Sequence, residues 1–316
     1  MKTLIVFLLL CLGAALPRAE AQTCSATVSS IDFGSPDILS GASTDALATL
    51  TVSCTGIPLL AVIKMCPSIG AGSAGSNGSA RLLTNGTRTL SYQLFQDSGR
   101  SQGWGSLDNT QLGTVPGIII GNILSGAGSA TRTIYARLYG DSSAAAGTYV
   151  SNFSGSQTTF SYSSMLLGAS TSCTGFVGNA IVRPEFTVTA SPQPTCTIST
   201  TDLDFGVKGV LNAAITGQSS LGIACTQGAS WSIVLDGGAS GNTAARRMTS
   251  PAGDNVSYNL YRDAARTSVW GASAATQATG TGTGNQQSVP VFGTVPAQPT
   301  PKPGVYSDRV VATIRY

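Results

Sequence analysis

Cysteine and histidine decide which chemistry this chain can perform. The sequence has seven cysteines, no histidine and no C-x-x-C pair. Cys11 lies in an apolar N-terminal run, so an even number of cysteines remains beyond it. Transition-metal sites need clusters of cysteine and histidine that this sequence does not offer. We therefore expect neither a metal site nor a cofactor.

Catalysis by a nucleophile or by paired carboxylates has little support. Without histidine, a serine or cysteine nucleophile loses its usual base. Carboxylate pairs remain, Asp32 with Asp37 and Asp202 with Asp204. Asp32 and Asp204 occupy the same place in a repeated element, which favours turn chemistry, and Asp202 is typical of a solvated loop. We expect that the protein is not an enzyme, with a secreted carboxylate hydrolase as the remaining enzymatic alternative.

The N-terminus has the features of an export signal. Lys2 precedes an apolar run from Leu4 to Leu16, and Ala19-Glu20-Ala21 offers small residues at both positions of an A-x-A cleavage site. The run is short for a membrane-spanning helix, which needs about 20 apolar residues. We expect residues 1–21 to be a signal peptide and the other cysteines to form disulfides after export.

Charge and composition exclude further classes of protein. Charged residues make up only 10% of the chain, and the net charge of +3 becomes +2 when the signal is removed. So small and scattered a charge does not indicate binding to nucleic acid or to an anionic membrane. The 38 glycines favour short strands joined by turns over long helices.

The two halves of the chain repeat one ordered set of landmarks. Each half has a cysteine followed nine residues later by the phenylalanine of an (I/L)-D-F-G element, then Cys-Thr, Y-x-L-(F/Y)-x-D, Trp-Gly and Gly-x-Tyr. The matched residues are Cys24 and Cys196, Phe33 and Phe205, Cys54 and Cys225, Tyr92 and Tyr258, Trp104 and Trp270, and Tyr149 and Tyr306. The chain is therefore two copies of one domain.

Each copy has the pattern of a β-sandwich. Apolar residues alternate with polar ones, as at Tyr92 and Leu94, and turn signals such as Asn85-Gly86 separate such runs. Matching the copies predicts the disulfides Cys24–Cys54 and Cys196–Cys225. Elimination leaves Cys66–Cys173, a link that only the first copy has.

This order of landmarks, ending in an alternating strand with a terminal tyrosine, resembles the spore coat protein U domain. Such domains are subunits of archaic, Csu-type chaperone–usher pili, and two in tandem after a signal peptide resemble the adhesive tip subunit. The resemblance implies two tandem immunoglobulin-like β-sandwich (pilin-type) domains, the C-terminal one lacking its last strand. We place an N-terminal adhesin domain at residues 22–190 and a C-terminal pilin domain at residues 191–316.

The resemblance also implies how the subunits join. A sandwich that lacks a strand is completed by the N-terminal extension of the next subunit, which adds to the open sheet edge. Gln22 would be the first mature residue, only two positions before Cys24, so we expect this end to donate no strand. A subunit of this kind belongs at the pilus tip, reached by export through the periplasm to the cell surface.

A segment of alternating apolar residues precedes the second copy, from Val182 through Phe186 and Val188 to Ala190. We expect it to complete the first copy within the same chain, which structurally equals an ordinary last strand of the first domain. The second copy stops at Tyr316, so we expect it to accept a donor strand from the next pilus subunit. The other expected partners are a periplasmic chaperone and an outer-membrane usher.

Three apolar segments distinguish the first copy from the second. They are Ile57, Pro58, Leu59 and Leu60, then Pro116, Ile118, Ile119 and Ile120, and finally Met165, Leu166 and Leu167. Flanking glycine and proline predict loops. In Csu-type tip adhesins, hydrophobic loops at the far end of the N-terminal domain bind abiotic surfaces, so the resemblance implies contact with an abiotic or host surface. The alternative is that these residues line the core.

Two other functions stay open at this point. One is a structural coat or pilus component without a ligand, which the exposure of the apolar segments would separate from an adhesin. The other is a lectin-like adhesin that holds a sugar on aromatic residues such as Trp104 and Tyr135.

Overall fold

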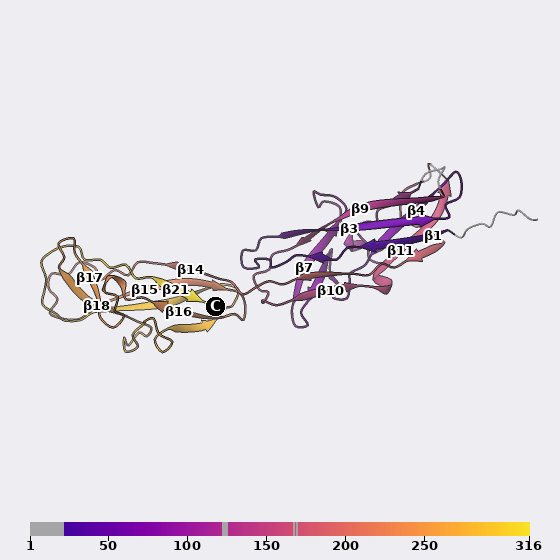
Figure 1. Ribbon diagram of the computed structural model, residues 1–316. Coiled ribbons are helices and arrows are strands. Elements are labelled where there is room, and N and C mark those ends of the chain that lie inside the picture. The colour runs from indigo at the N-terminus through magenta and orange to yellow at the C-terminus, as the bar shows by residue number, and fades with distance from the viewer. Residues whose placement is uncertain (1–21, 122–125, 167, 169) are drawn as a thin grey trace, which may run out of the picture.

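The computed structural model describes residues 22–121, 126–166, 168 and 170–316, and it has two β-sandwich domains placed end to end (Figure 1). In these ranges every regular element of more than three residues is a strand. The short exceptions are the 3-10 turns η1 (Thr110–Leu112), η2 (Gly155–Gln157) and η3 (Gly238–Ser240). No helix among the described residues is long and apolar enough to cross a membrane. The expected signal peptide, residues 1–21, lies outside the described residues.

The larger sheet of the first domain joins nine strands. Their order is β1 (Thr23–Val28), β3 (Thr44–Thr55), β9 (Ala127–Leu138), β7 (Thr89–Phe95), β6 (Ala80–Thr84), β10 (Tyr149–Phe153), β13 (Phe186–Ala190) and β2 (Ile31–Asp32), with β5 (Ser76–Asn77) paired to β6. Strand β13 is antiparallel to β10 and parallel to β2. A segment from the end of the domain therefore lies between an early and a late strand.

The second sheet of the first domain faces this one. Its order is β12 (Ala180–Val182), β11 (Thr158–Leu166), β4 (Ala61–Ile69) and β8 (Ile118–Ile120). Every residue of β4 is buried, which fits a central strand covered on both faces. The core between the sheets holds Leu50, Ile63, Leu94, Trp104 and Phe160, each at most 1% exposed.

The second domain repeats this plan with fewer strands. One sheet has the order β14 (Cys196–Thr200), β15 (Ile215–Cys225), β20 (Gln286–Val295), β18 (Asn255–Tyr261) and β17 (Arg246–Thr249). The other has the order β19 (Ala278–Thr281), β16 (Ser230–Leu235) and β21 (Ala312–Arg315). Two internal copies with matching cores and two facing sheets each confirm the predicted sandwich architecture.

All three predicted disulfides are present. Cys24–Cys54 and Cys196–Cys225 link the first strand of each domain to its antiparallel neighbour. Cys66–Cys173 joins β4 to the segment that follows β11, 107 residues away. In the chain-entropy model a loop of that length contributes about 4.7 kcal/mol to stability.

The junction between the domains contains direct backbone contacts. Ala145 forms a parallel bridge with Gln227 of the second domain. Gly284, at a φ of +76°, lies so close to Ser142 that a Cβ atom built there would be 2.1 Å from the Ser142 carbonyl oxygen. The Gly147 N–H donates to the carbonyl of Pro192 in the linker, at 3.0 Å. Only glycine permits the approach at position 284.

Candidate functional site

Strand β13 fills the space at the edge of the first domain's core. Phe186, Val188 and Ala190 point inward and are 4%, 0% and 0% exposed. They lie opposite Phe153, Ser151 and Tyr149 of β10. The ring of Phe186 stacks on that of Phe153 with 4.4 Å between centroids. Every second residue of this strand therefore closes the core.

The second domain contains the counterpart of β10, but the described residues include no counterpart of β13 beside it. Tyr149 donates its hydroxyl to the carbonyl of Ala145, and Tyr306 donates to that of Lys302, in each case four residues earlier. Residues 306–310 thus occupy the place of residues 149–153. Within the described chain their strand pairing is limited to one bridge, from Ser307 to Thr249 of β17.

A groove of about 420 Å³, lined by apolar side chains together with polar ones such as Thr201, Asp202 and Ser219, lies where a counterpart of β13 would be. Its lining includes Leu203, Phe205, Leu221, Leu235, Met248, Tyr258, Leu260, Val291, Tyr306, Asp308, Val310 and Ala312. Leu203 and Phe205 match Ile31 and Phe33, which are 1% and 5% exposed in the first domain. In the second domain both stay partly exposed. The second domain is therefore a sandwich lacking its last strand.

Two carboxylates, Asp202 and Asp308, also line this groove, and Asp308 lies on the segment that matches β10. Asp308 Oδ2 accepts a hydrogen bond of 2.7 Å from the hydroxyl of Tyr258. Burial is the largest cause that raises the pKa of Tyr258, and the bond to Asp308 raises it further. At pH 7 Tyr258 is neutral, so it can donate to the carboxylate.

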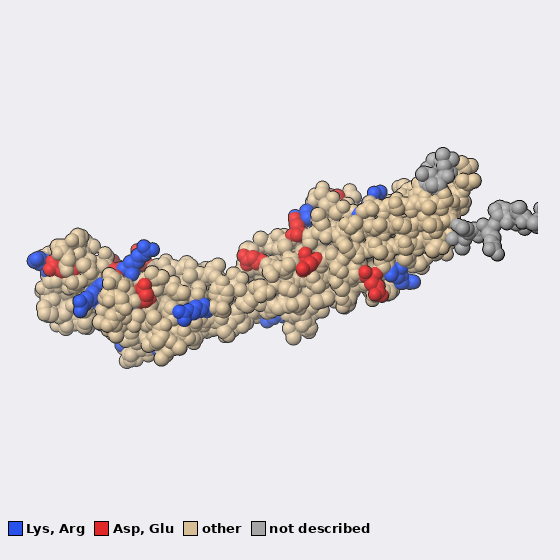
Figure 2. All heavy atoms as spheres, viewed as in Figure 1, with Lys and Arg blue, Asp and Glu red and all other residues tan. Residues whose placement is uncertain are grey.

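A second candidate site is the end of the first domain that lies away from the second. Leu166 of β11 pairs with Ala61 of β4, and Thr55 of β3 pairs with Ala127 of β9, so these strand ends lie at the same end of the domain as the connection of residues 56–60. On the face shown in Figure 2 this end has no charged side chain. The sequence agrees, since residues 46–63, 109–131 and 142–182 contain no Asp, Glu, Lys or Arg.

Three leucines at this end are strongly exposed among the described residues. Leu59, Leu60 and Leu166 are 76%, 62% and 74% exposed. Leu60 has a φ of +64°, a left-handed conformation that suits glycine or asparagine better than leucine. Leu60 therefore combines high exposure with a strained backbone conformation.

The segment beside these leucines is held down by a buried cation and a disulfide. Lys64 is 4% exposed, and its ammonium group donates to the carbonyls of Ser170 and Ser172 and lies 4.5 Å from the ring centroid of Phe176. The disulfide from Cys66 to Cys173 secures the same segment.

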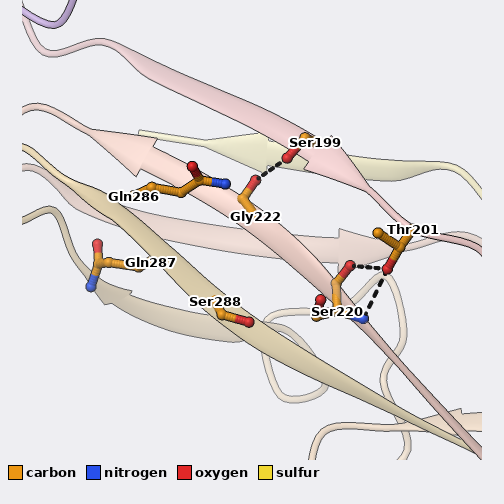
Figure 3. Close-up of a pocket in the computed structure, with 7 residues that line it drawn as sticks. All are labelled: Ser199, Thr201, Ser220, Gly222, Gln286, Gln287 and Ser288. Atoms are coloured by element: carbon orange, nitrogen blue, oxygen red, sulfur yellow. Dashed lines mark hydrogen bonds between the residues drawn. The ribbon is translucent and has the colours of Figure 1, made fainter.

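A shallow polar patch on the second domain does not form a site. It lies over β14, β15 and β20 and is lined by Ser199, Thr201, Ser220, Gly222, Gln286, Gln287 and Ser288 (Figure 3). The drawn hydrogen bonds join neighbours on adjacent strands, such as Thr201 to Ser220. None of the lining residues is charged. The part of the chain that the structure describes also holds no group of three or more His, Cys, Asp or Glu side chains fit to bind a metal.

Comparison with known proteins identifies the family. The Spore Coat Protein U domain model matches residues 13–154 and again residues 183–313. The chain belongs to the Spore Coat Protein U domain family. Protein U of Myxococcus xanthus is 38% identical over 117 residues, a match that covers 35% of this chain and 65% of Protein U, just under two thirds of its length.

Two solved structures are similar to these tandem Spore Coat Protein U domains, and the fold is shown by the first of them. One is a chain of the CsuC–CsuE chaperone–tip adhesion subunit pre-assembly complex, from the archaic chaperone–usher Csu pili of Acinetobacter baumannii. It has a TM-score of 0.55 and 18% identity over 93% of this chain and 100% of that chain. The other is the CupB6 tip adhesin from Pseudomonas aeruginosa, with a TM-score of 0.39 and 11% identity over 92% of both chains. The predicted pilin-type fold is confirmed, and the family is non-enzymatic.

Three of the residues expected in exposed surface loops of the first Spore Coat Protein U domain are buried in the structure. Ile57, Ile118 and Ile120 are 4%, 0% and 1% exposed and belong to the core. Residues 118–120 form strand β8 rather than a loop, because they pair with residues 63–65 of β4. The prediction that these three side chains are exposed is wrong.

The remaining residues of the three segments differ in exposure. Pro58, Leu59, Leu60 and Leu166 are exposed, whereas Pro116, Ile119 and Met165 are partly buried. Met165 and Leu166 end strand β11 instead of lying in a loop. Leu167 lies outside the described residues. Pro58 and leucines 59, 60 and 166 are therefore the surface-binding candidates that remain exposed among the described residues.

The aromatic residues named for a lectin-like function are not free to stack on a sugar. Trp104 is 1% exposed, and its indole donates to the carbonyl of Pro67 inside the core. Tyr135 carries the guanidinium of Arg100 on its ring, at 5.9 Å. The turn role predicted for Asp32 and Asp204 is confirmed, because each carboxylate accepts the N–H of the glycine two residues later.

Sequence reasoning missed the buried arginine in each Spore Coat Protein U domain. Arg81 and Arg246 are both 0% exposed. They lie 11 and 12 residues before the matched tyrosines Tyr92 and Tyr258, so aligning the two copies could have found them. Asp308 was missed because its counterpart in the first copy is a serine, Ser151.

Proposed function

We propose that this protein is the adhesive tip subunit of a chaperone–usher pilus. The second domain accepts a donor strand from the next subunit, and the first domain binds a surface through the uncharged end that carries Leu59, Leu60 and Leu166. A periplasmic chaperone and an outer-membrane usher would handle the chain before assembly.

The groove of the second domain is the observation that carries this proposal. In the first domain the same place is filled by β13, with Phe186 and Val188 buried in the core. An open sheet edge beside an apolar groove is the feature that strand addition uses. Left open in a free protein, such an edge favours aggregation, which is the physical reason for a chaperone.

The limits of the family matches support the same proposal. The second match begins at residue 183, ahead of Cys196, and so includes the segment that forms β13. That segment belongs to the second copy by sequence, yet its residues pair with β10 and β2 of the first domain. One copy's leading segment completing the preceding domain is the arrangement proposed between neighbouring pilus subunits.

Burial of leucine supports the adhesive role. Each aliphatic side chain that is fully removed from water contributes about 1.5–3 kcal/mol. Leu59, Leu60 and Leu166 lie at an end where the face shown in Figure 2 has no charged side chain, so contact with an apolar solid there would dehydrate few ionic groups. The positive φ of Leu60 is a strain of the kind that concentrates at functional positions.

The acceptor role can be tested by supplying a strand in cis. Residues 163–191 of this chain, with Cys173→Ser, would be fused after Tyr316, which is the counterpart of Tyr162. We expect the second domain to become more stable by about 3 kcal/mol or more, because two large side chains fill the groove. Urea unfolding followed by tryptophan fluorescence measures the change.

The control is the same fusion with Asp in place of Phe186 and Val188 in the added segment. It should leave the second domain as unstable as the unfused chain, since a charge cannot enter the groove without a partner. Equal stability of the unfused chain, the fusion and the control would contradict the acceptor role.

A further inference from the structure

Asp308 places a carboxylate in the middle of the acceptor groove. It lies between Tyr306 and Val310, whose side chains line the same groove. Its Oδ1 atom accepts from the backbone N–H of Ala239 at 2.9 Å and of Arg309 at 2.8 Å. With the hydroxyl of Tyr258 on Oδ2, the carboxylate has three hydrogen bonds and a fixed position.

The first domain shows what would cover this position. Ser151 stands in the place of Asp308, and Tyr92 stands in the place of Tyr258. Val188 of β13 lies directly opposite Ser151. In the first domain Tyr92, Ser151 and Val188 are all 0% exposed. Residues directly opposite in an antiparallel pair project from the same face of the sheet. A donor strand in this register therefore lays one side chain onto residue 308.

The chemistry of that donor side chain matters more in the second domain than in the first. An ionised carboxylate offers about four acceptor positions, and three of those on Asp308 are in use. A valine side chain would cover the fourth acceptor position of Asp308 without donating a hydrogen bond to it, which is unfavourable. A serine or threonine hydroxyl would donate to it.

We propose that Asp308 selects the donor strand, favouring a partner subunit whose donor segment carries serine or threonine at the position matching Val188. This rests on the proposed function of the groove. The same residue disfavours the chain's own segment, in which valine holds that position. Specificity of this kind works through rejection of the wrong strand, and it would keep copies of this protein from joining one another.

The experiment uses the fusion of residues 163–191 after Tyr316 with two inserts, one native and one with Val188→Thr in the added segment. Each insert is combined with Asp308 and with Asp308→Ser, which reproduces the first domain. With Asp308, we expect the threonine insert to raise the folding equilibrium constant of the second domain about tenfold above the valine insert. With Asp308→Ser, the valine insert should raise the folding equilibrium constant of the second domain at least as much as the threonine insert does.

The outcomes separate the two proposals. If both inserts stabilise the Asp308 protein equally, selection by Asp308 is wrong and the acceptor role stands. If neither insert stabilises any variant, the acceptor role fails, and the selection with it. Should Asp308→Ser fold poorly, Asp308→Asn keeps a side chain that can accept from Tyr258 and removes the charge. Its threonine preference should fall well below tenfold, and an unchanged preference would overturn the proposal.

Discussion

Each domain holds one arginine in its core without a carboxylate partner. Arg81 donates to the carbonyls of Ile69, Gly70 and Trp104 at 2.7–2.8 Å, and also to the side chain of Gln93. Burial lowers the pKa of Arg81 to about 10, so it remains charged at pH 7. The guanidinium thus joins the end of β4 to the Trp-Gly element and to β7 through one rigid group.

Replacing Arg81 should cost more stability than replacing any surface arginine. Arg81→Met leaves buried carbonyls without donors, and we expect a loss of about 3–5 kcal/mol in the first domain. Arg81→Lys should recover only part of it, because an ammonium group cannot span the same acceptors. Urea unfolding measures both variants. Arg88→Met, at an exposed position, is the control, and a similarly small effect for Arg81→Met would contradict this role.

A carboxylate organises the same turn in both domains. Asp263 accepts from the N–H groups of Thr267 and Ser268, as Asp97 does from Ser101 and Gln102. The hydrogen bond from the Thr267 backbone, followed by that from Ser268, lowers the pKa of Asp263 to about 2. The turn lets Arg266 adopt a φ of +57° and lie over the ring of Phe292.

The lowered pKa of Asp263 predicts a pH-dependent contribution to stability. The pKa of an aspartate in the unfolded chain is about 3.9. The contribution of Asp263 to stability is therefore complete above that pH and is lost as the pH falls towards about 2. The wild-type second domain should therefore lose stability faster than Asp263→Asn between these values. Urea midpoints of both proteins across this range test the prediction, and parallel curves would count against it.

At the scale of elements, the two domains differ most at the place of one strand. Strand β13 buries Phe186 and Val188 and turns Thr187 and Thr189 outward. The alternation ahead of Cys196 predicted this strand. Its neighbours could not be predicted from periodicity, because β13 pairs with β2, 157 residues earlier in the chain.

We expect Phe186→Asp to destabilise the first domain by at least about 3 kcal/mol, because it puts a charge into the core beside Phe153. Thr187→Asp is the matched control on the outward face of the same strand and should change stability by less than about 0.5 kcal/mol. Thermal unfolding of the mature chain measures both. Similar effects of the two substitutions would mean that β13 does not close this core.

At the scale of the whole molecule, the two proposed contacts serve different purposes and lie in different domains. The proposed acceptor groove belongs to the second domain, and the exposed leucines adjoin the ends of β3, β4 and β11 in the first, whose strands are labelled in Figure 1. Cys66–Cys173 and Lys64 stiffen the first domain beside those leucines. Force applied to an adhesive end would therefore pass through a disulfide-braced sandwich.

Polar substitution at the leucine end should weaken attachment without affecting the fold. Leu59→Asn together with Leu60→Asn removes two exposed aliphatic groups, and asparagine suits the positive φ at position 60. We expect at least about a tenfold loss of binding to polystyrene by the mature chain, a loss that grows when many copies act together.

The matched control is Leu47→Asn, since Leu47 is 61% exposed on β3 near the other end of the domain. It should bind polystyrene like the unmodified protein. Unchanged binding by the Leu59/Leu60 variant, with an unchanged melting curve, would move the adhesive surface elsewhere and favour a structural component without a ligand.

Sequence alone determined the features that depend on local order. The repeated landmarks defined two copies of one sandwich and, with the even number of cysteines, the three disulfides. Alternation of apolar residues defined β13, because side chains on a strand point to opposite faces in turn. The Asp turns followed from the (I/L)-D-F-G element being present twice.

Tertiary structure decided which apolar residues face water. Ile118 and Leu59 look alike in a sequence, since both lie in apolar runs flanked by glycine or proline. Ile118 is buried because its strand pairs with β4 beneath the opposite sheet, whereas Leu59 lies beyond the end of β3 and is 76% exposed. Asp308 gained its importance in the same way, because only folding brings it to Tyr258 and into a groove that another strand can cover.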